Sequence, residues 1–163
     1  MIILHALPVS QRSQLKQNKM NLKIYLIDDD LDDQMFFSVV MKEIDENILC
    51  FLDSDGSSIE ELVKNPINLP ALFFIDIHIN AKSGWFYLNL IKNDAQLSAI
   101  PVIMYSTSPS PKDVEKAKND GALLLIAKHD EYYELLHCMR KIITHLKEGT
   151  LNIVTHSEVN CMN

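Results

Sequence analysis

The sequence has no long hydrophobic run, only three widely spaced cysteines and no cluster of basic residues. No apolar stretch approaches the roughly 20 residues needed to span a bilayer, so we expect no membrane-spanning helix and no membrane partner. The opening "MIILHALPVS" is apolar but short, and it lacks a preceding basic segment and a small-residue cleavage pattern. It is therefore a poor signal peptide, and we expect a cytoplasmic protein.

Cysteine spacing and net charge exclude two further classes of protein. The three cysteines are odd in number and widely spaced, which does not fit a Cys-type zinc site. The net charge is −7 without a long run of Lys and Arg, so direct binding to nucleic acid is not expected. With 163 residues, 47% of them hydrophobic and 23% charged, the chain has the composition of one globular domain with a buried core.

Short apolar runs alternate with amphipathic stretches along the chain. Each run is nearly continuous and rich in branched or aromatic residues, as in strands that helices cover on both faces. The predicted strands are 22–27, 48–52, 71–77, 100–106 and 122–128. The predicted helices are 32–43, 57–64, 84–94, 110–118 and 130–148. This alternation predicts an α/β fold with a doubly wound, five-stranded parallel sheet and helices on both faces.

The pattern also predicts the limits of the folded part and some local detail. Residues 1–20 are predicted to be a flexible N-terminal extension, 21–149 the folded domain and 150–163 a C-terminal tail. The residues of the first helix that we expect to face the core are Met35, Phe36, Val39 and Val40. The helix at 110–118 has clear start signals, namely Ser110 as N-cap, Pro111 at the first position and Asp113 three residues after the cap.

Polar residues gather at the carboxyl ends of the predicted strands, where a doubly wound sheet places its ligand site. They are Asp28, Asp29 and Asp30 after the first strand, Asp76 in the third, Ser106 and Thr107 at the fourth and Lys128 at the fifth. Carboxylates this close together repel one another in a partly desolvated pocket and need a cation. Oxygen-only ligands with room for water favour Mg²⁺ over zinc. The sequence therefore predicts a Mg²⁺ site at this edge.

Asp76 is a candidate nucleophile in such a site. A carboxylate can attack phosphorus to form an acyl phosphate while Mg²⁺ offsets the charge of the incoming oxygens. Lys128 would supply a positive charge to a phosphoryl oxygen, and Ser106 a hydroxyl donor. Asp32 and Asp33, in contrast, are attributed to a negative first turn that complements the dipole of the first helix. A phosphoryl-acceptor site is therefore predicted.

The ordered motifs "LIDDD", "LFFIDIHINAKSG", "PVIMYSTS" and "LLLIAK" resemble the receiver domain of two-component response regulators, of the stand-alone type. The resemblance implies the flavodoxin-like strand order 2-1-3-4-5 for the domain at 21–149. It implies that the phosphorylated aspartate is Asp76, assisted by Lys128 and by Ser106, with Ser106 and Thr107 in the switch region. The implied metal ligands are Asp28, Asp29, Asp76 and the backbone carbonyl of His78. Gly84 matches the glycine that follows the loop after the third strand.

The resemblance also implies an activity and its partners. A phosphoryl group would pass from a phosphohistidine on a histidine kinase or phosphotransfer protein to Asp76 and then be lost by slow self-hydrolysis. The protein would be a Mg²⁺-dependent phosphoacceptor switch and not a conventional turnover enzyme. Because the residues after 149 are too few to fold alone, we expect the signal to leave through a downstream protein of unknown identity. A homodimer through the fourth and fifth predicted helices is left open.

Two positions depart from the receiver pattern and support an alternative. His129 stands where the family commonly has a proline after the lysine, and that lysine–proline peptide bond is typically cis. A cis bond before a residue other than proline costs roughly 2.5–4 kcal/mol, so we expect a trans bond between Lys128 and His129. Leu125 stands where many receivers have a switching Tyr or Phe, so the usual aromatic swing is not expected. The alternative is a degenerate receiver that acts as a phosphorylation-independent protein-binding module.

Two enzyme or cofactor hypotheses fit the sequence less well. An aspartate-based phosphatase of the haloacid dehalogenase type requires a second Asp two residues after the nucleophile, and that position is His78. A flavin-binding protein of the same fold would need a phosphate-cradling loop after the first strand. Here three aspartates follow that strand, and they would repel an anionic cofactor.

Overall fold

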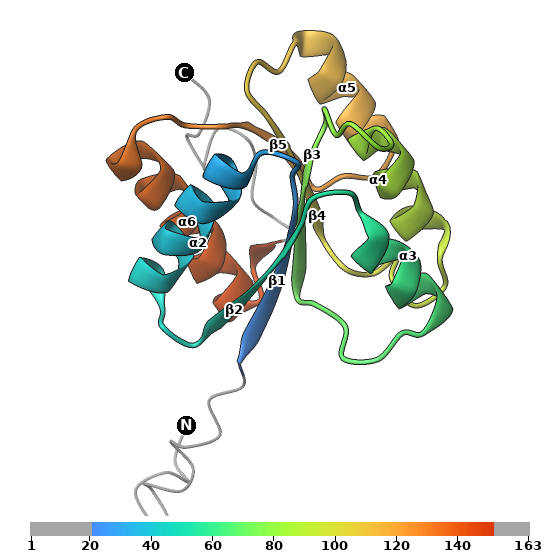
Figure 1. Ribbon diagram of the computed structural model, residues 1–163, viewed down its shortest axis with the longest axis horizontal. Coiled ribbons are helices and arrows are strands. Elements are labelled where there is room, and N and C mark those ends of the chain that lie inside the picture. Colours follow the sequence, from blue (N-terminus) through green and yellow to red (C-terminus); the bar gives the residue numbers. More distant parts are fainter. Residues whose placement is uncertain (1–20, 152–163) are drawn as a thin grey trace, which may run out of the picture.

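The computed structural model describes residues 21–151 and has the predicted parallel sheet (Figure 1). Its strands are β1 (Leu22–Ile27), β2 (Ile48–Asp53), β3 (Leu72–Asp76), β4 (Val102–Ser106) and β5 (Leu124–Ala127). All neighbouring strands are parallel, in the order β2-β1-β3-β4-β5. The predicted fold class and strand order are therefore confirmed. The predicted extension, 1–20, and all but the first two residues of the predicted tail lie outside the described residues.

Within residues 21–151, five helices cover the two faces of the sheet. They are α2 (Leu31–Ile44), α3 (Ser57–Lys64), α4 (Gly84–Asn93), α5 (Pro111–Asn119) and α6 (Tyr132–Glu148). Helices α2 and α6 lie on one face, and α3, α4 and α5 lie on the other (Figure 1). Each face has its own hydrophobic cluster, and β3 and β4 are buried along their whole length between the two. None of the helices within 21–151 combines the length and apolar character needed to cross a membrane.

The core-facing side of α2 differs from the prediction. Phe37, Val40 and Met41 are buried, whereas Met35 is 68% exposed and Val39 is 50% exposed. The segment "MFFSVVM" is apolar at almost every position, so more than one helical face satisfies the pattern. Packing against β1, β3 and α6 selects the face that contains Phe37, and the predicted inward positions of Met35 and Val39 are wrong.

The predicted start signals of α5 are confirmed. Ser110 caps α5, and its hydroxyl and the Asp113 carboxylate form the reciprocal bonds of a capping box, with Pro111 at the helix start. Gly149 ends α6 in a left-handed conformation, with φ of 71°. Within 21–151 every peptide bond is trans, including the one between Lys128 and His129.

Candidate functional site

The acidic residues after β1 and at the end of β3 meet at one edge of the sheet. β1 and β3 are parallel neighbours, so their carboxyl ends lie side by side. Carboxylate oxygens of Asp28, Asp29 and Asp76 all lie within 4.8 Å of one another. Asp28 has no exposed surface and Asp76 is only 5% exposed, so their charges are largely removed from solvent.

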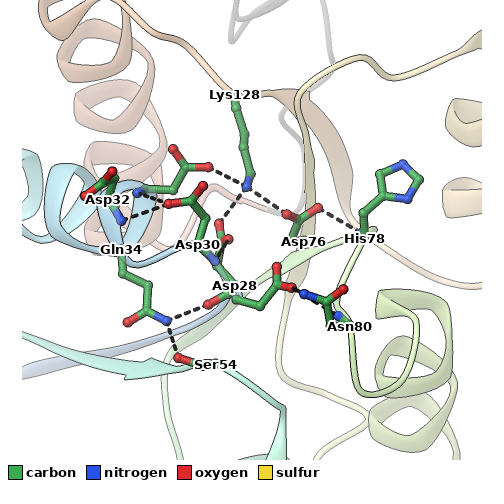
Figure 2. Close-up of polar contacts among 11 residues, drawn as sticks. Asp28, Asp30, Asp32, Gln34, Ser54, Asp76, His78, Asn80 and Lys128 are labelled. Carbon is green, nitrogen blue, oxygen red and sulfur yellow. Dashed lines mark hydrogen bonds and ion pairs between the residues drawn. The ribbon is translucent and has the colours of Figure 1, made fainter.

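Lys128 reaches this cluster from the end of β5 (Figure 2). Its Nζ atom lies 2.8 Å from Asp28 Oδ2, 2.7 Å from Asp76 Oδ2 and 2.7 Å from Asp33 Oδ2. The lysine side chain is only 8% exposed. Burial by itself lowers the pKa of this ammonium group, but the three carboxylates outweigh that effect and raise the pKa, so Lys128 stays charged.

Burial of the Asp28 carboxylate has an electrostatic cost. Burial raises its pKa to about 6, although the hydrogen bond and charge of Lys128 act in the opposite direction. Its Oδ1 accepts the backbone N–H of Asp30 at 3.1 Å. Its Oδ2 is buried and, among the described residues, has only the ion pair with Lys128 and no well-aligned hydrogen-bond donor. An under-coordinated carboxylate oxygen beside two further carboxylates fits a hard divalent cation.

The turn after β1 is held in shape by its own polar groups (Figure 2). Asp30 caps α2 by accepting the backbone N–H groups of Asp32 at 2.8 Å and Asp33 at 3.3 Å. The buried Gln34 amide donates to the Asp28 carbonyl and to Ser54 Oγ, the latter at 2.8 Å. These bonds fix the direction in which the Asp28 carboxylate leaves the strand.

The loop after β3 supplies donors to two of the carboxylates (Figure 2). The backbone N–H of His78 donates to Asp76 Oδ1 at 2.9 Å, while the other carboxylate oxygen accepts Lys128. Asn80 donates to Asp29 Oδ2 from its backbone N–H at 3.2 Å and from its side-chain amide. His78 itself is exposed, and its backbone carbonyl remains a predicted metal ligand.

Gly84 begins α4 where the helix passes close to the backbone of Asp76. A Cβ atom at this position would lie 2.0 Å from the Asp76 carbonyl oxygen, which is far too close. The Gly84 N–H also donates to the Ile77 carbonyl at 3.0 Å. A glycine is therefore required for α4 to pack against the end of β3 that presents the Asp76 carboxylate.

The two predicted switch residues differ in their surroundings. Ser106 ends β4 and is only 1% exposed, whereas Thr107 is exposed. Their backbone is tied to the site, since the Lys128 N–H donates to the Ser106 carbonyl at 2.8 Å. Within 21–151 the Ser106 hydroxyl makes no hydrogen bond to another residue, so its predicted role toward a phosphoryl group stays a prediction.

Leu125 and the nearby Tyr105 lie on opposite faces of the sheet. Leu125 is buried in the cluster under α3, α4 and α5, whereas Tyr105 packs with Phe37 and Phe74 on the α2 and α6 face. The β4–β5 register pairs Tyr105 with Ile126 and not with Leu125. Tyr105 therefore cannot take the place of the aromatic residue that Leu125 replaces.

Sequence reasoning missed two residues of this site. The sequence pattern attributes Asp33 to the helix dipole alone, yet its carboxylate pairs with Lys128, 95 positions away in the chain. No sequence pattern singles out Asn80, which pairs with Asp29. The available signal for Asp33 was its position three residues after the N-cap, where a side chain points back toward the start of the helix.

Comparison with known sequences identifies a distant relative of this chain. No family model matches the sequence. The chain is 25% identical over 126 residues to Protein PilG of Pseudomonas aeruginosa, an alignment that covers 77% of this chain and 90% of that protein.

Solved structures of response regulators superpose well on the chain. The phosphorylated cyanobacterial phytochrome response regulator RcpA has a TM-score of 0.71 at 21% identity, covering 79% of this chain and 96% of that one. The Mn²⁺-bound form of response regulator Rcp1 has a TM-score of 0.67 at 22% identity, covering 82% and 97%. The chemotaxis response regulator CheY4 of Vibrio cholerae has a TM-score of 0.62 at 19% identity, covering 74% and 98%. The chain therefore has the receiver fold of response regulators, as its sequence resemblance predicts.

Proposed function

We propose that this protein is a phosphoacceptor switch, which takes a phosphoryl group onto Asp76 from a histidine kinase or a histidine phosphotransfer protein. The observation that carries the proposal is the placement of Asp76 at the carboxyl end of the central strand, between the Lys128 ammonium and the Asp28–Asp29 pair. Such an arrangement combines a nucleophile with the positive charge that a phosphoryl group needs. The receiver fold supports the same role.

The proposed reaction transfers one phosphoryl group. An oxygen of the Asp76 carboxylate forms a bond to phosphorus as the bond from phosphorus to the donor imidazole nitrogen breaks, and the electron pair of that bond stays on the nitrogen. The product is an acyl phosphate. Lys128 is close enough to turn its ammonium toward a phosphoryl oxygen, and Ser106 would donate a hydroxyl hydrogen bond from the end of β4. Later attack by water on phosphorus releases phosphate and restores the carboxylate.

We propose Mg²⁺ as the cofactor of this site. Asp28, Asp29, Asp76 and the His78 carbonyl would hold it, and its charge would offset that of the entering phosphoryl oxygens. The three converging carboxylates and the under-coordinated Asp28 oxygen support this assignment. The similar response regulator Rcp1 has been solved in a Mn²⁺-bound form. All-oxygen ligands with room for water favour Mg²⁺ over zinc.

The proposal is tested by phosphorylation in vitro. The purified protein is incubated with Mg²⁺ and acetyl phosphate, and intact mass spectrometry is expected to show the addition of one phosphoryl group. Asp76→Asn abolishes the gain, whereas Asp32→Asn, which removes an exposed carboxylate from the same face, retains it. If the wild type gains no mass under conditions that phosphorylate a known receiver, the phosphoacceptor role is wrong.

The degenerate-receiver alternative makes the opposite prediction. It requires that Asp76→Asn leave partner binding and cellular output unchanged. The structure does not favour this alternative, because the residues of the predicted site lie together. These are Asp28, Asp29, Asp76 and Lys128. The departures at Leu125 and His129 affect the route of the signal out of the site, and we propose that this route ends in a separate downstream protein.

A further inference from the structure

Lys128 has one carboxylate partner that lies outside the predicted metal-binding set. Asp33, on the first turn of α2, places Oδ2 2.7 Å from the Lys128 Nζ atom. The Asp33 side chain is 40% exposed at the rim of the pocket, whereas Lys128 is 8% exposed within it. An ammonium group has three N–H donors, and here three carboxylates surround it, those of Asp28, Asp33 and Asp76.

We propose that Asp33 is a positioning residue, which holds the Lys128 ammonium toward the rim and so preserves the affinity of Asp28, Asp29 and Asp76 for a divalent cation. The inference rests on the proposed function, because it concerns the same site. Two of the three Lys128 partners, Asp28 and Asp76, are also proposed metal ligands. The ammonium and the metal therefore compete for the same oxygens. Among the ion-pair partners of Lys128 within residues 21–151, only Asp33 neutralises it without occupying a metal ligand.

The expected consequence follows from this competition. When Asp33 is replaced by Asn, the full charge of Lys128 is balanced by Asp28 and Asp76 alone. The lysine then moves closer to these ligands and repels the cation more strongly. Because Asp33 is partly exposed, solvent screens the effect, and we expect Mg²⁺ binding to weaken by about three- to tenfold.

Asp32 provides a matched control on the same turn. It has the same side chain and charge as Asp33, and its backbone N–H also donates to the Asp30 cap. Asp32 is exposed, and the ion pairs found within 21–151 do not include its carboxylate. Asp32→Asn therefore reproduces the change in net charge and in the helix dipole but leaves Lys128 untouched.

The experiment measures Mg²⁺ binding to the full chain by isothermal titration calorimetry, without a phosphodonor. Asp33→Asn is expected to weaken binding, Asp33→Glu to restore most of it, and Asp32→Asn to leave it within twofold of the wild type. Phosphorylation by acetyl phosphate should be slower in Asp33→Asn at low Mg²⁺ and recover at saturating Mg²⁺. That split identifies an effect on metal affinity and not on the transfer step. A merely structural role for Asp33 would not produce it.

The outcomes separate this inference from the proposed function. Equal weakening by Asp33→Asn and Asp32→Asn would overturn the inference, because a general charge effect would then suffice. Unchanged binding in Asp33→Asn, or no Mg²⁺ binding by the wild type, would overturn it as well. If the wild type gains no phosphoryl group but Asp33→Asn still weakens Mg²⁺ binding selectively, the phosphoacceptor role fails and the positioning role stands.

Discussion

The cost of burying Asp28 leads to a prediction that can be worked out numerically. Burial raises the pKa of Asp28 from 3.8 to about 6, with the attraction of Lys128 already opposing the rise. One pKa unit corresponds to about 1.4 kcal/mol, so the ionised carboxylate destabilises the metal-free folded state by about 3 kcal/mol at neutral pH. We therefore expect Asp28→Asn, which cannot ionise, to be more stable than the wild type by up to this amount.

The sign of the effect gives it a distinctive pH dependence. The folded state binds the Asp28 proton more tightly than the unfolded chain does. The protonated Asp28 carboxyl group therefore contributes folding stability that is fully present below a pH of about 4. This contribution is lost as the pH rises through about 6, the pKa of Asp28 in the folded state. The difference in unfolding free energy between Asp28→Asn and the wild type should accordingly be small at pH 4 and largest above pH 6.

The assay is urea denaturation followed by circular dichroism, in EDTA, at several pH values on both sides of pH 6. Asp32→Asn serves as the control for loss of one exposed charge. Added Mg²⁺ should stabilise the wild type by about 2.7 kcal/mol at a concentration of 100 times Kd, and the variant by much less. A lower stability of Asp28→Asn than of the wild type at neutral pH in EDTA, or a difference that does not grow with pH, would contradict this prediction.

Three further predictions concern single side chains. Lys128→Met leaves the buried carboxylates without their countercharge, so denaturation in EDTA should show a loss of about 3–5 kcal/mol that Mg²⁺ partly restores; a loss insensitive to Mg²⁺ would contradict the charge argument. Gly84→Ala drives a methyl group into the Asp76 carbonyl, so thermal unfolding should show a loss of about 1–3 kcal/mol together with slower phosphorylation; wild-type behaviour in both would show that α4 can shift freely. Ser110→Ala removes the cap of α5 and should cost about 1 kcal/mol without changing Mg²⁺ affinity, whereas Ser110→Asp should restore stability.

The strands were predictable because of where they lie. A strand buried on both faces must be apolar along its whole length, and β3 and β4 are buried throughout. The same rule makes a polar residue at the end of such a run conspicuous, as Asp76 is. Parallel strands end at one edge, so the proximity of Asp28 to Asp76 also followed from the order of the elements.

The inward face of α2 was not predictable for a related reason. Its apolar residues are too closely spaced to define one stripe, so the pattern admits the face of Met35 and Val39 as well as that of Phe37 and Met41. Only contact with the sheet and α6 decides between them. At Ser110, by comparison, the cap depends on residues within one turn, and local sequence was sufficient.

The sequence by itself therefore determined the parallel α/β fold and the acids, hydroxyl and amine that gather at its carboxyl edge, because burial and topology impose these patterns locally. The tertiary structure decided which acids the Lys128 ammonium contacts. A lysine side chain is long and flexible, and its partner Asp33 is 95 residues distant, so no local pattern records the pairing. The structure alone also placed Tyr105 and Leu125 on opposite faces, since side chains alternate along a strand and the register between β4 and β5 is a long-range property.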